Sequence, residues 1–395
     1  MSSLLLAIIY LAFISLGLPD SLLGSSWPEM HRVMGVELSA MGIITTLIAI
    51  GTVISSLMSD RLTKKFSTKI VVTFSVALTA VGLFGFSFAP RFWVLCIFAI
   101  PYGLGAGAID AALNNYVALY YTSRHMSWLH CFWGVGAVIS PYVMSYALGT
   151  AQGWAGGYRI IGTVQIIIAL ILVAALPLWN KAGHSSAEQS SVDESAPRES
   201  LGLFGSLKIP GVPLVLLGFL GYCAAESTVM VWASTYFFEA KQTGEELAAA
   251  MGSLFYIGMT VGRFLSGFIS NRVGDKNMIR VGLAISAVGV AVVAIPSNLT
   301  VAIIGFLLIG LGFAPLYPSI IHSTPNSFGS ENSQAIIGIQ MAAAYLGATL
   351  APPIFGLVAN YIDVRLLPLY LAFFMIMSVL MLELLNKRSP RKKEN

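Results

Sequence analysis

Twelve long apolar runs constrain the fold of this 395-residue chain more than any other feature. A helix that crosses a bilayer needs about 20 mostly apolar residues. The runs lie near residues 4–28, 38–59, 69–88, 92–119, 127–149, 157–180, 210–238, 246–270, 278–296, 299–321, 333–359 and 366–386. Only 10% of the residues are charged, whereas a soluble domain carries roughly a quarter. We therefore predict an all-α, multi-pass membrane protein with twelve transmembrane helices in two pseudo-symmetric six-helix bundles.

Several classes of function are excluded by what the chain lacks. Its three cysteines (Cys96, Cys131 and Cys223) lie inside apolar runs without the spacing of a disulfide or a zinc site. It has no clustered histidines, no nucleophile with a base, and no Gly-x-x-x-x-Gly-Lys loop for a nucleotide. The net charge of +4 is too small for a nucleic-acid groove. We expect neither an enzyme nor a nucleic-acid binder, and no cofactor or metal.

The charged loops predict the topology. Sixteen Lys and Arg residues fall on the side of the two termini and five on the other, with Arg263 inside a run. Positive residues concentrate on the cytoplasmic side, so we expect both termini there, in the cell membrane. The first run, followed by Pro19 and Asp20, lacks a basic leader and a cleavage motif, and we interpret it as a transmembrane helix. The polar segment 181–208 is expected to be a cytoplasmic linker between an N-terminal bundle (1–180) and a C-terminal bundle with a basic tail (209–395).

The two halves resemble each other, because four features recur at offsets between 206 and 211 residues. The recurring features are Asp60-Arg61 with Asn271-Arg272, Gly103-Leu104-Gly105 with Gly310-Leu311-Gly312, Gly136-Ala137 and Pro141 with Gly347-Ala348 and Pro352, and Asp20 with Glu226. Secondary transporters are built from such repeats, with their substrate site near the middle of the membrane.

The loops after the second and eighth runs carry a recognisable pattern. Ser59 to Lys65 and Gly267 to Lys276 resemble the Gly-x-x-x-Asp-Arg-x-Gly-basic signature of the major facilitator superfamily, in which this loop latches one conformation. The second copy keeps both glycines and has Asn271 in place of Asp, whereas the first keeps Asp60-Arg61 but has Ser56 and Thr63 where glycine is usual. The resemblance implies a conformational latch at Asp60 and Arg61, with Asn271 and Arg272 as its counterpart. The alternative is a loop whose positive charge only anchors the topology.

Four ionisable residues lie deep inside the runs: Asp20, Asp110, Glu226 and Arg263. Such residues are costly in a bilayer and are by default candidates for function. Asp20 lies among glycines and prolines that can interrupt a helix. Asp110 and Asn114 are four residues apart and share a helix face. Glu383 is near the end of the last run, where its side chain can reach the interface.

The chain resembles the fucose, galactose and glucose proton symporter branch of the superfamily. The resemblance rests on Gly17 to Pro28 with its acid, on Gly103 to Asn114, on His130 to Pro141, and on Glu226 with Trp232. In the fucose symporter, acids in the first and fourth spans carry substrate recognition and proton coupling, and Asp20 and Asp110 match them, although the fourth-span acid there is Glu. We therefore expect Asp110 to be the main proton carrier and Asp20 to bind substrate hydroxyls or assist coupling. Both acids could instead serve helix packing.

Glu226 and Arg263 are the only deep charges of the second half. We expect them to form an ion pair, because an unpaired charge in this setting is strongly destabilising. Glu226 would then be a fixed acceptor for a substrate hydroxyl, and direct substrate contact by Arg263 stays open.

Polar and aromatic side chains in the runs supply the remaining substrate-binding candidates. They are Asn114, Asn115, His130, Trp133, Trp232, Tyr236, Tyr256, Tyr317, Gln340 and Tyr345. Each aromatic ring could equally pack against lipid or other helices.

The sequence thus predicts a monomeric secondary transporter for a small polar solute, foremost a monosaccharide, by proton symport with alternating access. Sodium-coupled sugar uptake, or export of amphipathic compounds by proton antiport into a pocket rich in Met and Phe, are the alternatives.

Overall fold

The computed structural model describes residues 3–37, 40–179, 202–243, 251, 254–295 and 298–388. Within these ranges the regular structure is helical, as predicted, and eleven helical segments are long and apolar enough to cross a membrane. The helix α12 (Leu254–Val273) is not among the eleven. It occupies the position of the eighth predicted run, beside residues 244–250 and 252–253, which lie outside the described ranges. Most of the expected linker 181–208 also lies outside them, apart from the short helix α9 (Gly202–Leu207).

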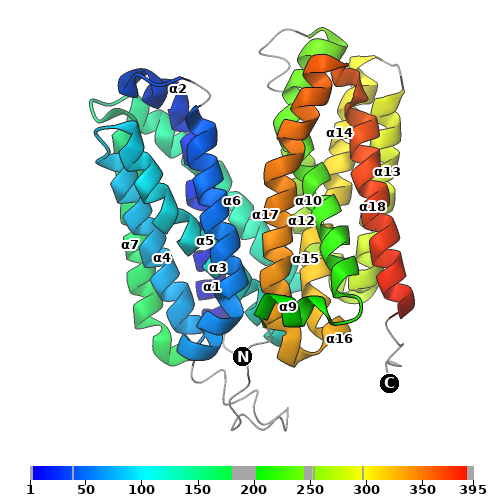
Figure 1. Ribbon diagram of the computed structural model, residues 1–395, viewed down its shortest axis with the longest axis horizontal. Helices are drawn as coiled ribbons and strands as arrows, with labels where there is room; N and C mark the ends of the chain where they lie inside the picture. Colours follow the sequence, from blue (N-terminus) through cyan, green and yellow to red (C-terminus); the bar gives the residue numbers. More distant parts are fainter. Residues whose placement is uncertain are drawn as a thin grey trace. The chain divides into compact units, whose positions relative to one another are not determined.

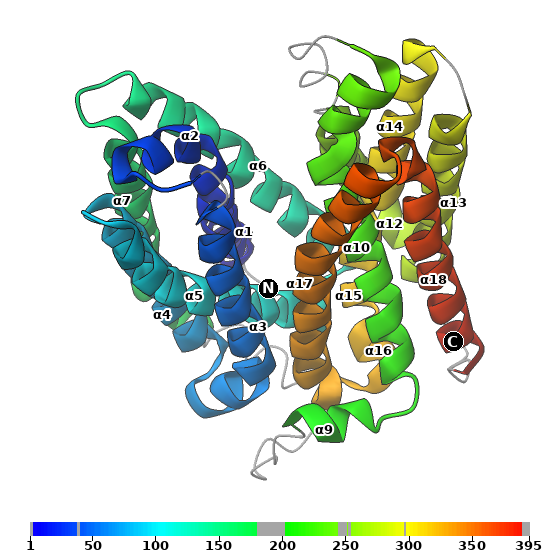
Figure 2. The same ribbon diagram turned by 45° about the horizontal axis from the view of Figure 1, so that its top comes forward.

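The chain divides into two compact units. Unit 1 comprises residues 1–120 and 129–202, and unit 2 comprises residues 121–128 and 203–395. The eight residues 121–128 include the first turn and a half of α6, which the sequence places with the N-terminal bundle. Figures 1 and 2 show the helices of each unit lying side by side.

Unit 1 is built around α5, against which α3 and α4 both pack, while α4 also packs against α7. Its helices are α1 (Ser3–Asp20), α2 (Leu22–Met34), α3 (Met41–Phe66), α4 (Thr68–Ser87), α5 (Phe92–Tyr120), α6 (Ser123–Leu148, from residue 129) and α7 (Gly153–Ala174).

Unit 2 repeats this arrangement, because α14 packs against α12 and α13, and α13 also packs against α18. In addition, α10 packs against α17 and α18. Besides α9 and α12, its helices are α10 (Val212–Thr235), the π-helix η2 (Tyr236–Ala240), α13 (Asp275–Ala294), α14 (Leu299–Phe313), α15 (Leu316–His322), α16 (Thr324–Phe328), α17 (Ser330–Tyr361), the 3-10 helix η3 (Val364–Leu366) and α18 (Leu367–Arg388).

The repeated glycines have the same packing role in both units. A Cβ atom added to Gly103 would lie 2.3 Å from the carbonyl oxygen of Ile48, and one added to Gly310 would lie 2.3 Å from that of Phe255. Gly310 follows Gly103 by 207 residues, and Phe255 follows Ile48 by the same number. Small residues let helices approach this closely. The internal repeat therefore extends to individual backbone contacts.

The structure corrects the register of the loop pattern in the first half. Gly274 separates α12 from α13 with φ 76° and ψ 153°, and its counterpart is Ser67 between α3 and α4, with φ 66° and ψ 153°. Thr63, which the sequence comparison places at the glycine position, lies inside α3. Aligned on these turns, the two loops are 207 residues apart, so that Lys64, and not Asp60, corresponds to Asn271.

Candidate functional site

Asp20 lies where the first membrane-spanning segment is interrupted. The helix α1 ends at Asp20, and α2 begins at Leu22. Proline has no amide hydrogen, so Pro19 leaves the carbonyl of Ser15, one turn earlier, without its helical donor. The buried Gln165 on α7 donates its side-chain amide to that carbonyl. The break in the helix is therefore stabilised by a side chain from a distant segment.

The carboxylate of Asp20 accepts two hydrogen bonds from aromatic side chains of unit 1. The hydroxyl of Tyr102 on α5 donates to Oδ1 at 3.2 Å, and the indole nitrogen of Trp133 on α6 donates to Oδ2 at 2.8 Å. Asp20 itself is exposed, although it lies within an apolar segment. These three side chains, which we call the Asp20 site, form an accessible acceptor held in place by two rings.

Asp110 belongs to a second polar group, which is buried. The side-chain amide of Asn114 donates to Asp110 Oδ1 at 2.7 Å, and Asn114 Oδ1 lies 3.1 Å from Nε2 of His130 on α6. Because the Asn114 oxygen is an acceptor here, Nε2 of His130 is the donor. All three side chains are at most 5% exposed. The three residues, which we call the Asp110 chain, connect α5 to α6.

The two polar groups use the same pair of helices. Asp110 follows Tyr102 by eight residues on α5, which corresponds to about 12 Å along a helix axis. Trp133 follows His130 by three residues on α6, and side chains at that spacing share a helix face. Asn115, another candidate, is also buried.

In unit 2, Glu226 on α10 and Arg263 on α12 form the expected ion pair, with Arg263 Nη2 at 3.2 Å from Glu226 Oε1. Both residues are buried, with 8% and 5% of their surface exposed. Their opposite charges therefore compensate each other in a setting where a single charge would be strongly destabilising.

The other candidates of unit 2 contact protein groups. The indole nitrogen of Trp232 donates to the carbonyl of Pro352 at 2.9 Å, the hydroxyl of Tyr317 donates to Met341 Sδ at 3.1 Å, and Gln340 Oε1 accepts from Thr324 at 3.0 Å.

Tyrosines form the rest of that set. The hydroxyls of Tyr236 and Tyr256 donate to the carbonyls of Val293 and Met230, and Tyr345 on α17 is half-buried. The Tyr256 contact ties α12 to α10, and the Tyr236 contact ties η2 to α13.

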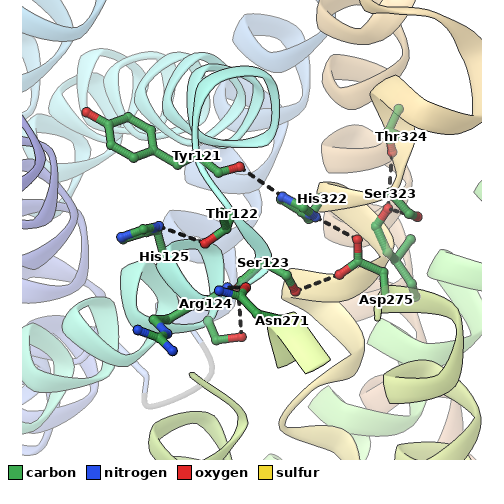
Figure 3. A network of polar contacts seen from close by, with 12 residues as sticks. Tyr121, Thr122, Ser123, Arg124, His125, Asn271, Asp275, His322, Ser323 and Thr324 are labelled. Atoms are coloured by element: carbon green, nitrogen blue, oxygen red, sulfur yellow. Dashed lines mark hydrogen bonds and ion pairs between the residues drawn. The ribbon is translucent and has the colours of Figure 1, made fainter. Parts of the chain in front are cut away.

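The expected latch residues fall into two groups. The buried Asp60 pairs with Lys64 at 3.0 Å within α3, and Arg61 is exposed. Asn271 Oδ1 accepts the backbone N–H of Arg124 at 3.0 Å, at the first turn of α6 (Figure 3). Arg272 is exposed.

Two polar pairs were missed by the sequence reasoning. His322 Nδ1 lies 2.6 Å from Asp275 Oδ2 near the Asn271 contact (Figure 3). Arg280 on α13 forms a bidentate pair with Glu383 on α18, at 2.6 and 2.8 Å. Both pairs join segments far apart in the chain, and the only signal in the sequence is that their members lie near the ends of apolar runs.

A family model for the Major Facilitator Superfamily matches residues 9–248 and 239–395. The chain belongs to this superfamily. It is therefore a multi-pass membrane protein of a transporter family, whose members bind small-molecule substrates and are not enzymes.

The relatives in this superfamily have diverse names. The chain is 24% identical to Bypass of stop codon protein 6 of Saccharomyces cerevisiae, over 90% of this chain and 77% of the relative. It is 21% identical to the glucose/mannose transporter GlcP of Bacillus subtilis, over 78% of this chain and 77% of the relative. It is also 21% identical to Multidrug resistance protein 2 of the same organism, over 95% and 92%.

Among solved structures, the transporter FucP in its outward conformation matches with a TM-score of 0.77 and 16% identity, over 96% of this chain and 99% of FucP. At this identity the match shows the fold.

Proposed function

We propose that this transporter moves a small polar solute, in the first place a monosaccharide, by proton symport with alternating access. The observation that carries the proposal is the Asp20 site, an exposed carboxylate held by Tyr102 and Trp133. Carboxylates accept hydrogen bonds from sugar hydroxyls, and aromatic rings offer apolar faces with a polar edge. A sugar would bind by replacing one aromatic donor on Asp20 with its own hydroxyl.

The Asp110 chain supports proton coupling. The Asp110 carboxylate accepts a hydrogen bond from the neutral side-chain amide of Asn114, and Asn114 in turn bonds to His130. Asp110 is 4% exposed and lies within the membrane-spanning helix α5, in the bonded group that joins α5 to α6. We propose that Asp110 is the main proton carrier and that Asn114 and His130 orient it. Asp20 binds substrate and assists coupling.

Unit 2 carries further substrate-binding candidates in this proposal. Glu226, fixed by Arg263, offers a carboxylate acceptor on α10. Trp232, Tyr317 and Gln340, with Asn115 in unit 1, are further candidates for substrate contact, and their present hydrogen bonds to protein groups would hold their side chains in position.

The names of two similar proteins point to the same substrate class. FucP is described as a fucose:proton symporter of E. coli, and GlcP as a glucose/mannose transporter. We propose that both termini lie in the cytoplasm, because sixteen Lys and Arg residues fall on the side of the termini and five on the other. We further propose that the protein is a monomer in the cell membrane.

A second candidate function is export of amphipathic compounds by proton antiport, which the likeness to Multidrug resistance protein 2 favours. Sodium in place of the proton is a further variant of sugar uptake. These functions differ from the proposal in ligand or in driving ion, so one binding experiment followed by one transport experiment distinguishes them.

The binding experiment is a thermal-shift screen of the purified protein against sugars, polyols and amphipathic drugs at two pH values. We expect stabilisation by hexoses, and its loss in Asp20→Asn and Trp133→Phe, which remove the acceptor charge and one of its donors. Trp93→Phe is the matched control, since Trp93 is exposed on α5 in the same unit. Stabilisation by drugs alone would exclude the sugar proposal in favour of export.

A further inference from the structure

A cluster of polar groups in unit 2 holds the start of α6, and the proposed transport mechanism does not use it. The carboxylate of Asp275, the first residue of α13, accepts a hydrogen bond from the Ser123 hydroxyl at 2.6 Å through Oδ1. Its other oxygen, Oδ2, lies 2.6 Å from Nδ1 of His322. The second ring nitrogen of His322, Nε2, lies 3.0 Å from the carbonyl oxygen of Tyr121. Figure 3 shows His322 between these two acceptors, and we call this arrangement the His322 clasp.

The number of protons in the clasp follows from its geometry. A backbone carbonyl only accepts hydrogen bonds, so the contact between Nε2 and Tyr121 requires a proton on Nε2. The contact between Nδ1 and Asp275 Oδ2 needs a second proton between the two atoms. A neutral imidazole beside an ionised carboxylate has only one proton for these two contacts. The pair in this structure therefore holds one proton more than a neutral histidine and an aspartate would carry.

The extra proton is best placed on the imidazole. Asp275 is the first residue of a 20-residue helix, and the dipole at a helix N-terminus stabilises an ionised carboxylate. Ser123 donates a further hydrogen bond to the same carboxylate. His322 is then an imidazolium with both N–H groups bonded. Its side chain is 14% exposed and that of Asp275 is 12% exposed, so water has little access to replace either contact.

Loss of that proton would break the clasp at one point. A neutral His322 that keeps its bond to Asp275 presents the lone pair of Nε2 to the carbonyl oxygen of Tyr121. The alternative tautomer keeps Tyr121 and presents a lone pair to the carboxylate. In either case two acceptors face each other at hydrogen-bond distance, and an unsatisfied buried acceptor is destabilising.

We propose that His322 and Asp275 form a proton-binding site, separate from the carboxyl groups of unit 1, whose occupancy fastens residues 121–128 to α13 and α15. Acidic conditions favour the fastened segment and alkaline conditions release it. The site does not depend on the transported substrate, nor on whether a proton or sodium drives transport.

Among the described residues, few other ionisable groups lie near His322. At the start of α6, His125 bonds to Thr122 at 3.0 Å and interacts electrostatically with His322, and the guanidinium of Arg124 lies over the Trp128 ring. Burial raises the pKa of the Tyr121 phenol, which therefore stays neutral near pH 7. The Arg124 charge would oppose a charge on His322, as would His125 when it is protonated, so Asp275 is the group that stabilises an imidazolium at His322.

The remaining elements packed against α15 add little charge near His322. On α13, Lys276 is exposed and Arg280 pairs with Glu383. On α10 the ionisable acid is Glu226, which pairs with Arg263. Neither α14 nor α16 carries a charged residue.

The direct test is nitrogen-15 NMR of the full-length protein in lipid nanodiscs with labelled histidine, of which the chain has five. An exposed histidine has a pKa of about 6.5. We expect one histidine to show two protonated ring nitrogens at pH 7.5 and to lose this signature in His322→Gln. If that variant does not fold, the signal is assigned by exclusion from single variants at the other four histidines. A neutral His322 ring at pH 7.5 would overturn the proposal.

Hydrogen exchange tests the consequence for α6. Because hydrogen bonds to charged groups are among the stronger ones, we expect peptides covering 121–128 to exchange about tenfold faster or more at pH 9 than at pH 6.5, after correction for intrinsic rates. In His322→Gln and Asp275→Asn, exchange should be fast at both pH values. The matched control is His125→Gln, which lies in the same cluster and should keep the wild-type dependence. A pH dependence that persists in His322→Gln, or that is lost in His125→Gln, would contradict the proposed site.

Discussion

The buried pair of Glu226 and Arg263 offers a sharp test of the packing of unit 2. Glu226→Gln removes the negative charge with little change in volume and leaves the Arg263 guanidinium, which is 5% exposed, without its compensating charge. The double variant Glu226→Gln/Arg263→Gln removes both charges. If the two residues form a pair in the folded protein, the double variant is more stable than Glu226→Gln alone.

The magnitude follows from the burial of both partners. Removing one partner of a buried pair costs about 3–5 kcal/mol, whereas replacing both is often close to neutral. With roughly 2–4 °C for each kcal/mol in chains of 150–250 residues, Glu226→Gln should lower the unfolding temperature by about 10 °C. The double variant should recover more than half of that loss.

The assay is thermal unfolding of the purified protein, followed by fluorescence at one pH and one detergent concentration. The matched control is Glu383→Gln, which breaks the pair with Arg280 at 2.6 Å in the same unit, where the side chains are 37% and 53% exposed. An exposed pair contributes about 0–1 kcal/mol, so this control should shift the unfolding temperature by no more than a few degrees.

Two results would refute the reasoning. One is a double variant as unstable as the sum of the two single variants, which would mean that the charges stabilise the fold through separate partners. The other is a decrease in unfolding temperature in Glu226→Gln that is no larger than the decrease in Glu383→Gln. That result would mean that the Arg263 charge is hydrated or compensated by another group.

Three further predictions concern the backbone of the two units. Gln165→Leu removes the donor to the Ser15 carbonyl at the Pro19 break and should lower the free energy of unfolding by about 1–3 kcal/mol, measured by thermal unfolding. Gln165→Glu keeps the side-chain shape but has no donor when ionised, so it should not restore the lost stability. Gly310→Ala places a methyl group 2.3 Å from the Phe255 carbonyl oxygen and should abolish folding, seen as loss of the monodisperse peak in size-exclusion chromatography. Gly24→Ala has no atom within 4 Å of the added carbon and should be tolerated. Ser67→Gly removes the backbone strain of a non-glycine residue at φ 66° and ψ 153° and should stabilise the protein by about 1 kcal/mol. Gly274→Ala introduces the same strain and should destabilise the protein by a similar amount. Equal effects of the same sign would contradict the equivalence of the two turns.

Much of the fold was predictable because it depends on local patterns. Apolar runs of bilayer length identify membrane helices, and the offset between Gly103 and Gly310 identifies the repeat, since the need for a close helix approach recurs with the sequence. The pairing of Glu226 with Arg263 could also be expected, because two opposite deep charges in one half have few other partners.

Contacts between distant segments could not be predicted in the same way. The carbonyl that Pro19 leaves without a donor is evident from the sequence, but nothing there shows that Gln165 supplies the donor. The same applies to His322 and Asp275, since each lies near the end of a run, where polar residues are common and carry no specific signal. The loop register failed because Ser67 adopts a backbone conformation that usually requires glycine, so that the sequence pattern pointed to Thr63.

The most direct test of the proposed mechanism is uptake into proteoliposomes with the Asp110→Asn variant. The wild-type protein should accumulate the sugar identified by the binding screen when a pH gradient is imposed, and should exchange labelled for unlabelled sugar without a gradient. Asp110→Asn should retain exchange, because Asp20 and its partners are unchanged, and should lose accumulation driven by the gradient. Accumulation at the wild-type level in Asp110→Asn would show that the proton travels by another route.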